Sequence, residues 1–334
     1  MNHKEPKQET DRLHPEQENI EFSHQPVMLR ECIAFLRIRA EGIYIDGTLG
    51  GGGHASAILQ ALGPAGRLIG IDQDDAALHA AEVKLAAAPA CGIYTLHKAN
   101  FADIQRVCKD CGISGVDGIL MDLGVSSYQF DTAERGFSYR LDAPLDMRMD
   151  RSNPLDAKIV VNQYAEPDLI RIIRAYGEES CAVQIGRSIV RAREKKPIET
   201  TLELADIIKA GMPSRAKHGG GHPAKRTFQA IRIEVNHELE VLKQALADGI
   251  GLLRPGGRFC VITFHSLEDR IVKNMFREAA DPCTCPADFP VCVCGRAPAG
   301  RLVTPRPITA AAEELAENRR ARSAKLRVFE KNEK

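Results

Sequence analysis

The chain has 334 residues, 44% of them hydrophobic, which is enough for one large or two modest globular domains with a sizeable core. Its 45 basic and 45 acidic residues cancel, which excludes a uniformly basic nucleic-acid-binding protein and restricts any such surface to a local patch. No apolar run is long enough to span a bilayer, and residues 1–22 are polar without the apolar stretch of a signal peptide. We therefore expect a disordered tail at residues 1–22 of a cytoplasmic protein that does not contact a membrane.

Strand and helix candidates alternate in the first part of the chain. Apolar strands are predicted at residues 43–45, 67–71, 93–97 and 116–121. Helices are predicted between them at residues 55–62, 76–88 and 101–111. Because continuous apolar strands that alternate with helices pack as a parallel sheet covered on both faces, the pattern predicts an α/β fold.

The pattern changes after the fourth strand. Residues 133–226 show helical spacing without β alternation and predict a helical insertion of small-domain size. Residues 23–132 and 227–334 then form one discontinuous α/β domain. Within its second part, apolar residues between Phe228 and Leu246 recur every three or four positions and predict one long helix. A strand at 258–264 and a helix at 267–276 follow.

A glycine-rich turn at residues 46–54 separates the first strand from its helix. Glycines permit positive φ and close approach to a ligand, and the start of the helix offers N–H groups. The spacing Gly50-x-Gly52-x-x-Ala55 also fits the dinucleotide fingerprint, so the glycines alone leave NAD open. The carboxylate of Asp46 before them suits a ligand with a positive charge or hydroxyl donors, which favours S-adenosylmethionine.

Two further acidic residues end predicted strands. Asp72 follows the second strand, where a carboxylate accepts hydrogen bonds from adenosine ribose hydroxyls; the alternative is a helix cap. Asp122 ends the fourth strand, at the sheet edge where ligands bind, and we expect it to face the cofactor or the substrate. The alternative for Asp122 is an Asp that caps its own backbone. The Ser, Tyr and Gln residues in the following loop favour a site.

Ten cysteines without a secretion signal indicate reduced thiols. Six are scattered, and small buried hydrophobic side chains explain them. The other four cluster with a spacing that can hold zinc, although a loop of free thiols is the alternative. They are Cys283, Cys285, Cys292 and Cys294.

Two runs of the neutral chain are basic. Residues 185–226 contain ten Lys or Arg against four Asp or Glu, and residues 318–327 form a basic tail. Each run is explained either by a solvated helix face or by nucleic-acid binding.

His265 and Ser266 end the fifth predicted strand. They begin the next helix or, alternatively, form a nucleophile pair, for which no oxyanion-hole turn is visible.

Seven stretches of the chain resemble the RsmH (MraW) methyltransferase family, and together they extend from about residue 24 to about residue 330. They are residues 24–29, 46–54, 122–131, 145–150, 228–236, 264–270 and the basic tail. The resemblance implies a class I (Rossmann-like) S-adenosylmethionine-dependent methyltransferase fold with a helical insertion that recognises the substrate. It implies methylation of the exocyclic N4 of a cytidine in the decoding centre (P site) of bacterial 16S rRNA, within the small ribosomal subunit. It implies cofactor contacts by Gly52, Gly53, His54, Asp72, Phe101, Asp122 and Gln129.

Methyl transfer to a cytosine amine needs acceptors near the nitrogen, because its lone pair is delocalised into the ring. We expect Asp122 and the carbonyl groups after it to supply them, with help from His265 or Asn236. The chain lacks the Asn/Asp-Pro-Pro-Tyr motif of many amino-methyltransferases. Two other function classes stay open from the residues: a nicotinamide-dependent oxidoreductase and a non-catalytic RNA-binding protein.

Overall fold

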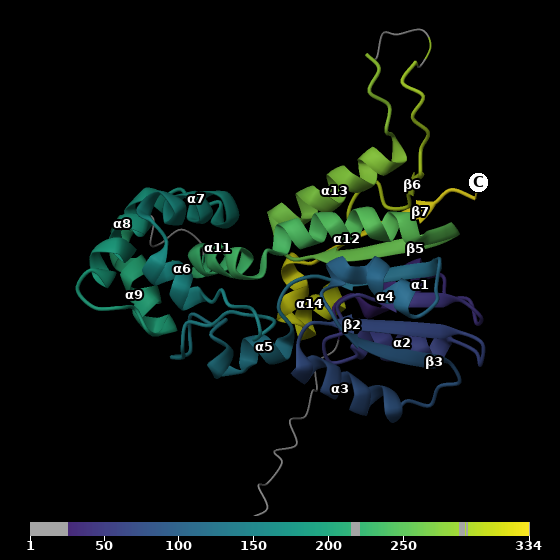
Figure 1. Cartoon of the computed structure of the whole chain (residues 1–334), viewed down its shortest axis with the longest axis horizontal. Helices are drawn as coiled ribbons and strands as arrows, with labels where there is room; N and C mark the ends of the chain where they lie inside the picture. The colour runs from purple at the N-terminus through teal and green to yellow at the C-terminus, as the bar shows by residue number, and fades with distance from the viewer. Residues whose placement is uncertain (1–25, 215–220, 287–290, 292, 334) are drawn as a thin grey trace, which may run out of the picture.

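A seven-stranded sheet forms the centre of the α/β part of the molecule in the computed structural model (Figure 1). The structure describes residues 26–214, 221–286, 291 and 293–333, so the predicted tail at 1–22 lies outside the described residues. The strands are β1 (Ile43–Asp46), β2 (Arg67–Asp72), β3 (Ile93–Lys98), β4 (Val116–Asp122), β5 (Leu253–Thr263), β6 (Gly300–Leu302) and β7 (Lys325–Lys331).

The strand order is β3-β2-β1-β4-β5-β7-β6, with the first five strands parallel and β7 antiparallel to both of its neighbours. The chain moves outward from β1 to β3 and then returns to place β4 on the other side of β1. This reversal opens a crevice at the carboxyl ends of β1 and β4. The predicted α/β fold is confirmed.

Helices cover both faces of the sheet because its central strands are apolar on both sides. In β4, Leu120 packs into one core, whereas Ile119 and Met121 pack into the core on the opposite face. The first face is covered by α1 (Leu29–Leu36), α2 (Gly53–Ala61) and α3 (Asp75–Ala86). The second is covered by α4 (Ile104–Asp110), α12 (Glu238–Leu252) and α13 (Ser266–Ala280).

The helical part lies beside the sheet and has its own core (Figure 1). It contains α6 (Ala157–Gln163), α7 (Glu166–Gly177), α8 (Ala182–Arg193), α9 (Thr201–Gly211) and α11 (Lys225–Asn236). Thr200 caps α9 by accepting the N–H of Glu203, which returns the bond in a capping box. The core includes Phe228 and Ile231 of α11, which lie beyond residue 226, the limit set from the sequence.

The prediction of one long helix from Phe228 to Leu246 is wrong. Helix α11 ends at Asn236, and α12 begins at Glu238 after His237 takes a left-handed φ of 50°. Phe228, Ile231 and Val235 of α11 pack into the helical part, whereas Leu242 and Leu246 of α12 pack on the sheet. A straight helix cannot reach both cores, so the chain turns between them.

The basic tail was not expected to form a strand. It begins with a short 3₁₀ helix, η3 (Arg319–Ser323), after α14 (Ala312–Glu317), and continues as β7. Leu326 and Val328 of β7 pack on one face of the sheet and Phe329 on the other, so this segment completes both cores.

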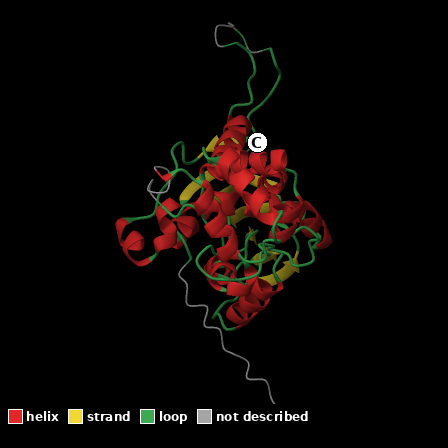
Figure 2. Ribbon diagram, turned by 90° about the vertical axis from the view of Figure 1, so that its left-hand side faces the viewer, coloured by secondary structure: helices red, strands yellow, loops and turns green. Residues whose placement is uncertain are grey.

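An arm between α13 and β6 extends away from the body, as Figure 2 shows from the side. Shorter helical segments, η1 (Phe101–Asp103), α5 (Ser127–Asp131) and η2 (Ala133–Arg135), follow β3 and β4. Among the described residues, no helix combines the length and the apolar character that crossing a bilayer requires.

Candidate active site

A cavity of about 830 Å³ opens at the carboxyl ends of the strands, between the sheet and the helical part. The sheet contributes the glycine turn and the strand-end acids, α11 contributes Lys225 and Arg232, and the tail contributes Arg319. Most of the predicted site residues line it. They are Gly53, His54, Asp72, Phe101, Asp122, Gln129, Asn236 and His265.

Asp122 lines this cavity and carries one buried carboxyl oxygen that is unsatisfied. Its backbone N–H donates to the hydroxyl of Thr48 at 2.6 Å, but its buried Oδ1 has no hydrogen-bond partner among the described residues. Burial, with the nearby charges of Asp46 and Glu268, raises the pKa of Asp122 well above its ordinary range. A buried acceptor without a donor is destabilising, so Asp122 is suited to meet a donor or a cation from a ligand.

Asp46 lies beneath the cavity at the end of β1 and is 1% exposed. Its Oδ1 accepts the N–H of Thr48 at 3.2 Å, whereas Oδ2 has no partner among the described residues. Burial raises the pKa of Asp46 to about 7, and the neighbouring charge of Asp72 adds to the shift. Negative charge at this edge of the sheet is therefore costly unless a donor or a cation offsets it.

Asp72 ends β2 and holds the glycine turn in place. Its Oδ2 accepts the N–H of Gly50 at 2.8 Å, and its Oδ1 accepts the N–H of Asp74 at 2.9 Å. Burial raises the pKa of Asp72 to about 6, although these N–H donors oppose the shift. The cap of α3 is Asp74, whose Oδ1 accepts the N–H of Ala76 at 3.1 Å. The helix-cap alternative for Asp72 is therefore wrong.

Gly50 and Gly52 are needed for the backbone conformation of the turn more than for direct contact with a ligand. Gly50 and Gly52 have φ of 49° and 73°, where other residues are strained. A Cβ on Gly52 would lie 3.1 Å from the Cα of Ala81, and Gly52 does not line the cavity. The N–H of Gly52 already donates to Leu49 at 2.8 Å, as that of Gly50 does to Asp72.

His54 is buried beside Asp122. Its Nε2 lies 3.0 Å from the carbonyl oxygen of Val27, and its Nδ1 lies 3.8 Å from Oδ2 of Asp122. Burial lowers the pKa of His54 to about 4, so the ring is neutral near pH 7. Nε2 then donates to Val27, and the lone pair of Nδ1 faces Asp122.

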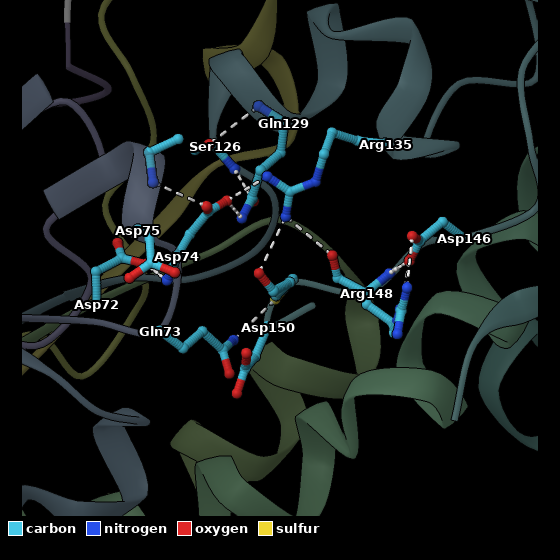
Figure 3. Close-up of polar contacts among 12 residues, drawn as sticks. Asp72, Gln73, Asp74, Asp75, Ser126, Gln129, Arg135, Asp146, Arg148 and Asp150 are labelled. Carbon is cyan, nitrogen blue, oxygen red and sulfur yellow. Dashed lines mark hydrogen bonds and ion pairs between the residues drawn. The ribbon is translucent and has the colours of Figure 1, made fainter. Parts of the chain in front are cut away.

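Gln129 belongs to a buried polar network that joins the sheet to the helical part (Figure 3). Oδ2 of Asp74 accepts from Nε2 of Gln129 at 2.7 Å and from Nη1 of Arg135 at 2.6 Å. Nη2 of Arg135 also donates to the carbonyl oxygens of Arg148 and Met149, both at 3.0 Å. Asp74 and Arg135 were not predicted to belong to the site, because no local sequence pattern marks a buried ion pair between distant residues.

Asn236 anchors the loop at residues 146–150. Its Oδ1 accepts the N–H of Met149 at 2.8 Å, and its Nδ2 donates to the carbonyl oxygens of Met147 at 2.8 Å and Arg232 at 2.9 Å. The side-chain amide of the last α11 residue is thus engaged with the loop that receives Arg135. These three hydrogen bonds hold the loop against the end of α11.

His265 begins α13, where both of its ring nitrogens face Glu268. Nδ1 accepts the N–H of Glu268 at 3.4 Å, and Nε2 lies 3.1 Å from Oε1 of Glu268. Burial alone would raise the pKa of Glu268, but His265, Arg232 and the N–H of Phe264 lower it overall. The helix-start prediction is confirmed, with His265 as the cap in place of Ser266.

Glu238, His265 and Glu268 place their ligand atoms within 4.8 Å of one another, as a cation site would. Arg232 already provides the positive charge there, because its Nε and Nη2 each lie 2.8 Å from an oxygen of Glu238. All four residues line the cavity. We therefore interpret this group as a fixed array of donors and acceptors on the wall of the cavity.

The cations of the first basic run divide into two groups. Arg193 donates to the carbonyl oxygens of Val161 and Tyr164, and Lys196 pairs with Glu203 at 2.8 Å, so these residues support the helical fold. Lys225 is exposed at the cavity. Residues 215–220 of this run lie outside the described residues.

The cations of the basic tail also divide into a group that supports the fold and a group at the cavity. Arg327 is buried and pairs with Asp269 at 2.7 Å, whereas Arg319 is exposed at the cavity rim. Arg320 lies 5.8 Å over the ring of Phe130 and 3.3 Å from Asp131. Only part of the predicted basic surface therefore faces the cavity. Of the predicted metal ligands, Cys283, Cys285 and Cys294 lie on the arm, and Cys292 lies outside the described residues.

Comparison with known proteins gives closely similar sequences over nearly the whole chain. The model of the MraW methylase family matches residues 21–332. The ribosomal RNA small subunit methyltransferase H 2 of Agathobacter rectalis is 56% identical over 315 residues, covering 94% of this chain and 100% of that protein. The ribosomal RNA small subunit methyltransferase H of Acetivibrio thermocellus is 57% identical over 312 residues, covering 93% and 100%. That of Symbiobacterium thermophilum is 55% identical over 310 residues, covering 93% and 97%.

Proposed function

The chain belongs to the MraW methylase family, and from this premise we propose that it is an S-adenosylmethionine-dependent rRNA methyltransferase. Its target is the exocyclic N4 of a cytidine in the decoding centre of bacterial 16S rRNA. The observation that carries the proposal is Asp122, whose Oδ1 has no partner among the described residues in a cavity at the switch point of the sheet. The names of the relatives, small subunit rRNA methyltransferases, support the substrate class.

The strand-end acids fit S-adenosylmethionine. The cavity volume of about 830 Å³ is in the range of sites that enclose ligands of this size. Asp72 would accept hydrogen bonds from the ribose hydroxyls, and Asp122 would meet the positively charged part of the ligand. Phe101 would contact the adenine, and His54 and Gly53 would complete the wall. When bound, S-adenosylmethionine supplies a methyl group on a sulfur that leaves readily.

Asp122 is also our candidate proton acceptor. The raised pKa of Asp122 gives its carboxylate a stronger affinity for the proton that the target nitrogen must lose. The lone pair of His54 Nδ1 faces Asp122 and provides a neighbour that can share this proton. Asp122 would thus hold the amine in line with the methyl group and then take its proton.

His265 and Asn236 are positioning residues in this proposal. Both nitrogens of His265 face Glu268, so its ring is oriented to cap α13 and to fix the wall that Arg232 completes. Asn236 holds the 146–150 loop, as its three hydrogen bonds indicate. Gln129 acts in the same way through Asp74, besides its place on the cavity wall.

The helical part would recognise the RNA. We extend it from residue 133 to Asn236, because α11 shares its core and carries Lys225 and Arg232 to the cavity. Together with Arg319 from the tail, these cations would contact RNA phosphates near the target base. The small ribosomal subunit is the proposed form of the substrate.

The two alternative functions have less support. A nicotinamide dinucleotide would bring its pyrophosphate to a turn where Gly50 and Gly52 already donate their N–H groups within the protein. The nearby acids Asp46, Asp72 and Asp122 offer acceptors, which suit a cation or hydroxyl donors better than a pyrophosphate. A non-catalytic RNA-binding protein would not need a carboxyl group with an unsatisfied oxygen in a cavity of this kind.

The test is transfer of labelled methyl groups from S-adenosylmethionine to small ribosomal subunits from a bacterial strain that lacks the corresponding methyltransferase. Digestion to nucleosides and chromatography should place the label on N4-methylcytidine. Asp122→Asn is the matched inactive variant, and protein-free 16S rRNA in a parallel reaction tests the form of the substrate. Label on any other nucleoside would contradict the proposed target, and binding of NADH in place of S-adenosylhomocysteine would contradict the proposed class.

A further inference from the structure

The described residues of the arm between α13 and β6 form no apolar core that could hold its two sides together. The arm leaves the body as two extended segments (Figure 1), and the side chains of Val291 and Val293 are 69% and 73% exposed. A short segment that buries so little apolar surface needs a crosslink or a bound metal to keep one shape. The arm carries cysteines on both segments.

The sulfur atoms of these cysteines gather at one point. The Sγ atoms of Cys283, Cys285 and Cys294 all lie within 4.8 Å of one another. The Sγ atoms of Cys283 and Cys294, from opposite sides of the arm, are 3.9 Å apart. Zinc–sulfur bonds of about 2.3 Å in a tetrahedron separate the sulfurs by about 3.8 Å. The observed separation therefore matches a shared metal ion, whereas a disulfide would need about 2.05 Å.

A backbone N–H group is placed to stabilise negative charge on one of these sulfur atoms. The N–H of Val293 points to Sγ of Cys285 at 3.4 Å. Metal-bound thiolates are commonly stabilised by such donors, which fix the ligand and disperse its negative charge. This contact and the sulfur cluster are independent of the cavity at the sheet edge, since none of the three cysteines lines it.

We propose that Cys283, Cys285 and Cys294 bind a structural zinc ion that joins the two sides of the arm. Thiolate ligands select zinc among the common divalent ions, and binding releases the thiol protons to solvent. Three thiolates and one further ligand complete the tetrahedron; Cys292, which the sequence offers, lies outside the described residues. The ion would set the direction in which the arm presents Val291 and Val293.

The experiment measures metal on the full chain, purified under reducing conditions without added chelator. Elemental analysis should give about one zinc per chain in the wild type. Cys283→Ser and Cys294→Ser should each lose most of it. Cys91→Ser, which changes an exposed cysteine elsewhere on the chain, should keep it. Replacing zinc by cobalt should give the absorption of a tetrahedral thiolate site, which Cys283→Ser should lack.

A second measurement separates this proposal from the proposed enzymatic function. S-adenosylhomocysteine affinity and the melting temperature of the α/β part should be unchanged within error in the Cys283→Ser protein, which also shows that the variant is folded. Equal zinc content in the wild type and Cys283→Ser would overturn the proposal. So would iron with inorganic sulfide in the purified protein, or disulfides among these cysteines in protein isolated without oxygen.

Discussion

Two buried polar regions lie next to each other in this molecule and differ in how well their groups are satisfied. At the strand ends, Asp46 and Asp122 each keep a carboxyl oxygen without a partner among the described residues, and their pKa values are raised. At the joint between the sheet and the helical part, Asp74 accepts from both Gln129 and Arg135. Both regions are buried and charged, so burial alone does not distinguish them.

The difference separates ligand binding from architecture. At the joint, the carboxylate of Asp74 is satisfied by Gln129 and Arg135, although Nε of Arg135 has no partner among the described residues, and we expect loss of this pair to lower stability. Groups at the strand ends are left for something that is not part of the chain, and we expect their loss to lower binding or turnover while stability is kept. Substitutions in the two regions should therefore move different measurements.

Asp122→Asn should have the largest effect on function. We expect turnover to fall by about 100- to 10,000-fold, because the proton acceptor is lost while the shape is kept. The melting temperature should stay the same or rise, since a poorly satisfied carboxyl is replaced. Methyl transfer to small subunits at saturating cofactor, with Asp103→Asn at an exposed site as control, measures this. Full turnover of the Asp122→Asn protein would remove Asp122 from the mechanism.

Arg135→Met should have the largest effect on stability. It leaves Asp74 buried beside Gln129 without its cation, and breaking a buried pair lowers the free energy of unfolding by about 3–5 kcal/mol. The exposed Arg106→Met change, which removes a surface pair with Asp103, should lower it by less than about 1 kcal/mol. Urea unfolding followed by circular dichroism measures both. Equal losses in the two variants would show that the joint does not carry the stability assigned to it.

Asp72→Asn should weaken cofactor binding with a smaller effect than the first two changes. Loss of hydrogen bonds to a charged acceptor corresponds to about 1.5–3 kcal/mol, or about 10- to 150-fold in affinity. Isothermal titration with S-adenosylhomocysteine measures it, and Asp75→Asn, at an exposed position three residues away, is the control. Unchanged affinity in Asp72→Asn would show that this carboxylate serves only the glycine turn.

The affinity for S-adenosylmethionine should fall as the pH falls through about 6. The pKa of Asp72 is raised to about 6, so its charge, which favours a cationic ligand, is lost below that pH. The fall is at most about tenfold per pH unit for this one group. The same raised pKa stabilises the ligand-free fold as the pH falls from about 6 toward the ordinary Asp value, so weaker binding there would not reflect unfolding. Binding titrations across this pH range should show that affinity changes less steeply with pH in Asp72→Asn than in the wild type.

Charge reversal at the cavity rim should have the smallest effect. Lys225→Glu and Arg319→Glu should each raise the KM for small subunits several-fold and reduce its salt dependence, because each removes one phosphate contact. Cofactor affinity should be unchanged. Glu substitution of Lys109, which is exposed on α4, is the matched control. An equal KM for all three proteins would place the RNA on another surface.

The class of fold and much of the cofactor edge could be predicted from the sequence because both depend on local patterns. Apolar strands of four to seven residues, a glycine turn and acids at strand ends are contiguous signals, and they placed Asp72 and Asp122 at the edge where the cavity opens. His54, which also lines the cavity, came from the family resemblance. The roles of His265 and Asn236 could not be predicted in this way. The role of each residue depends on its hydrogen-bond partners, which the nearby sequence only partly predicts. Asn236, for example, binds Met149, which lies 87 residues away in the sequence.

The sequence by itself determined the five parallel strands, the edge of the sheet at which the cavity opens, and which family the chain resembles. Only the tertiary structure decided that α11 and α12 are two helices, because their apolar sides face different cores. It also decided that the basic tail leads into a strand second from the edge of the sheet, since β7 pairs with both β5 and β6. Finally, it decided which acidic side chains have hydrogen-bond partners for both carboxyl oxygens and which do not. A carboxyl group's partners are set by folding distant segments together, and this is what separates Asp74 from Asp122.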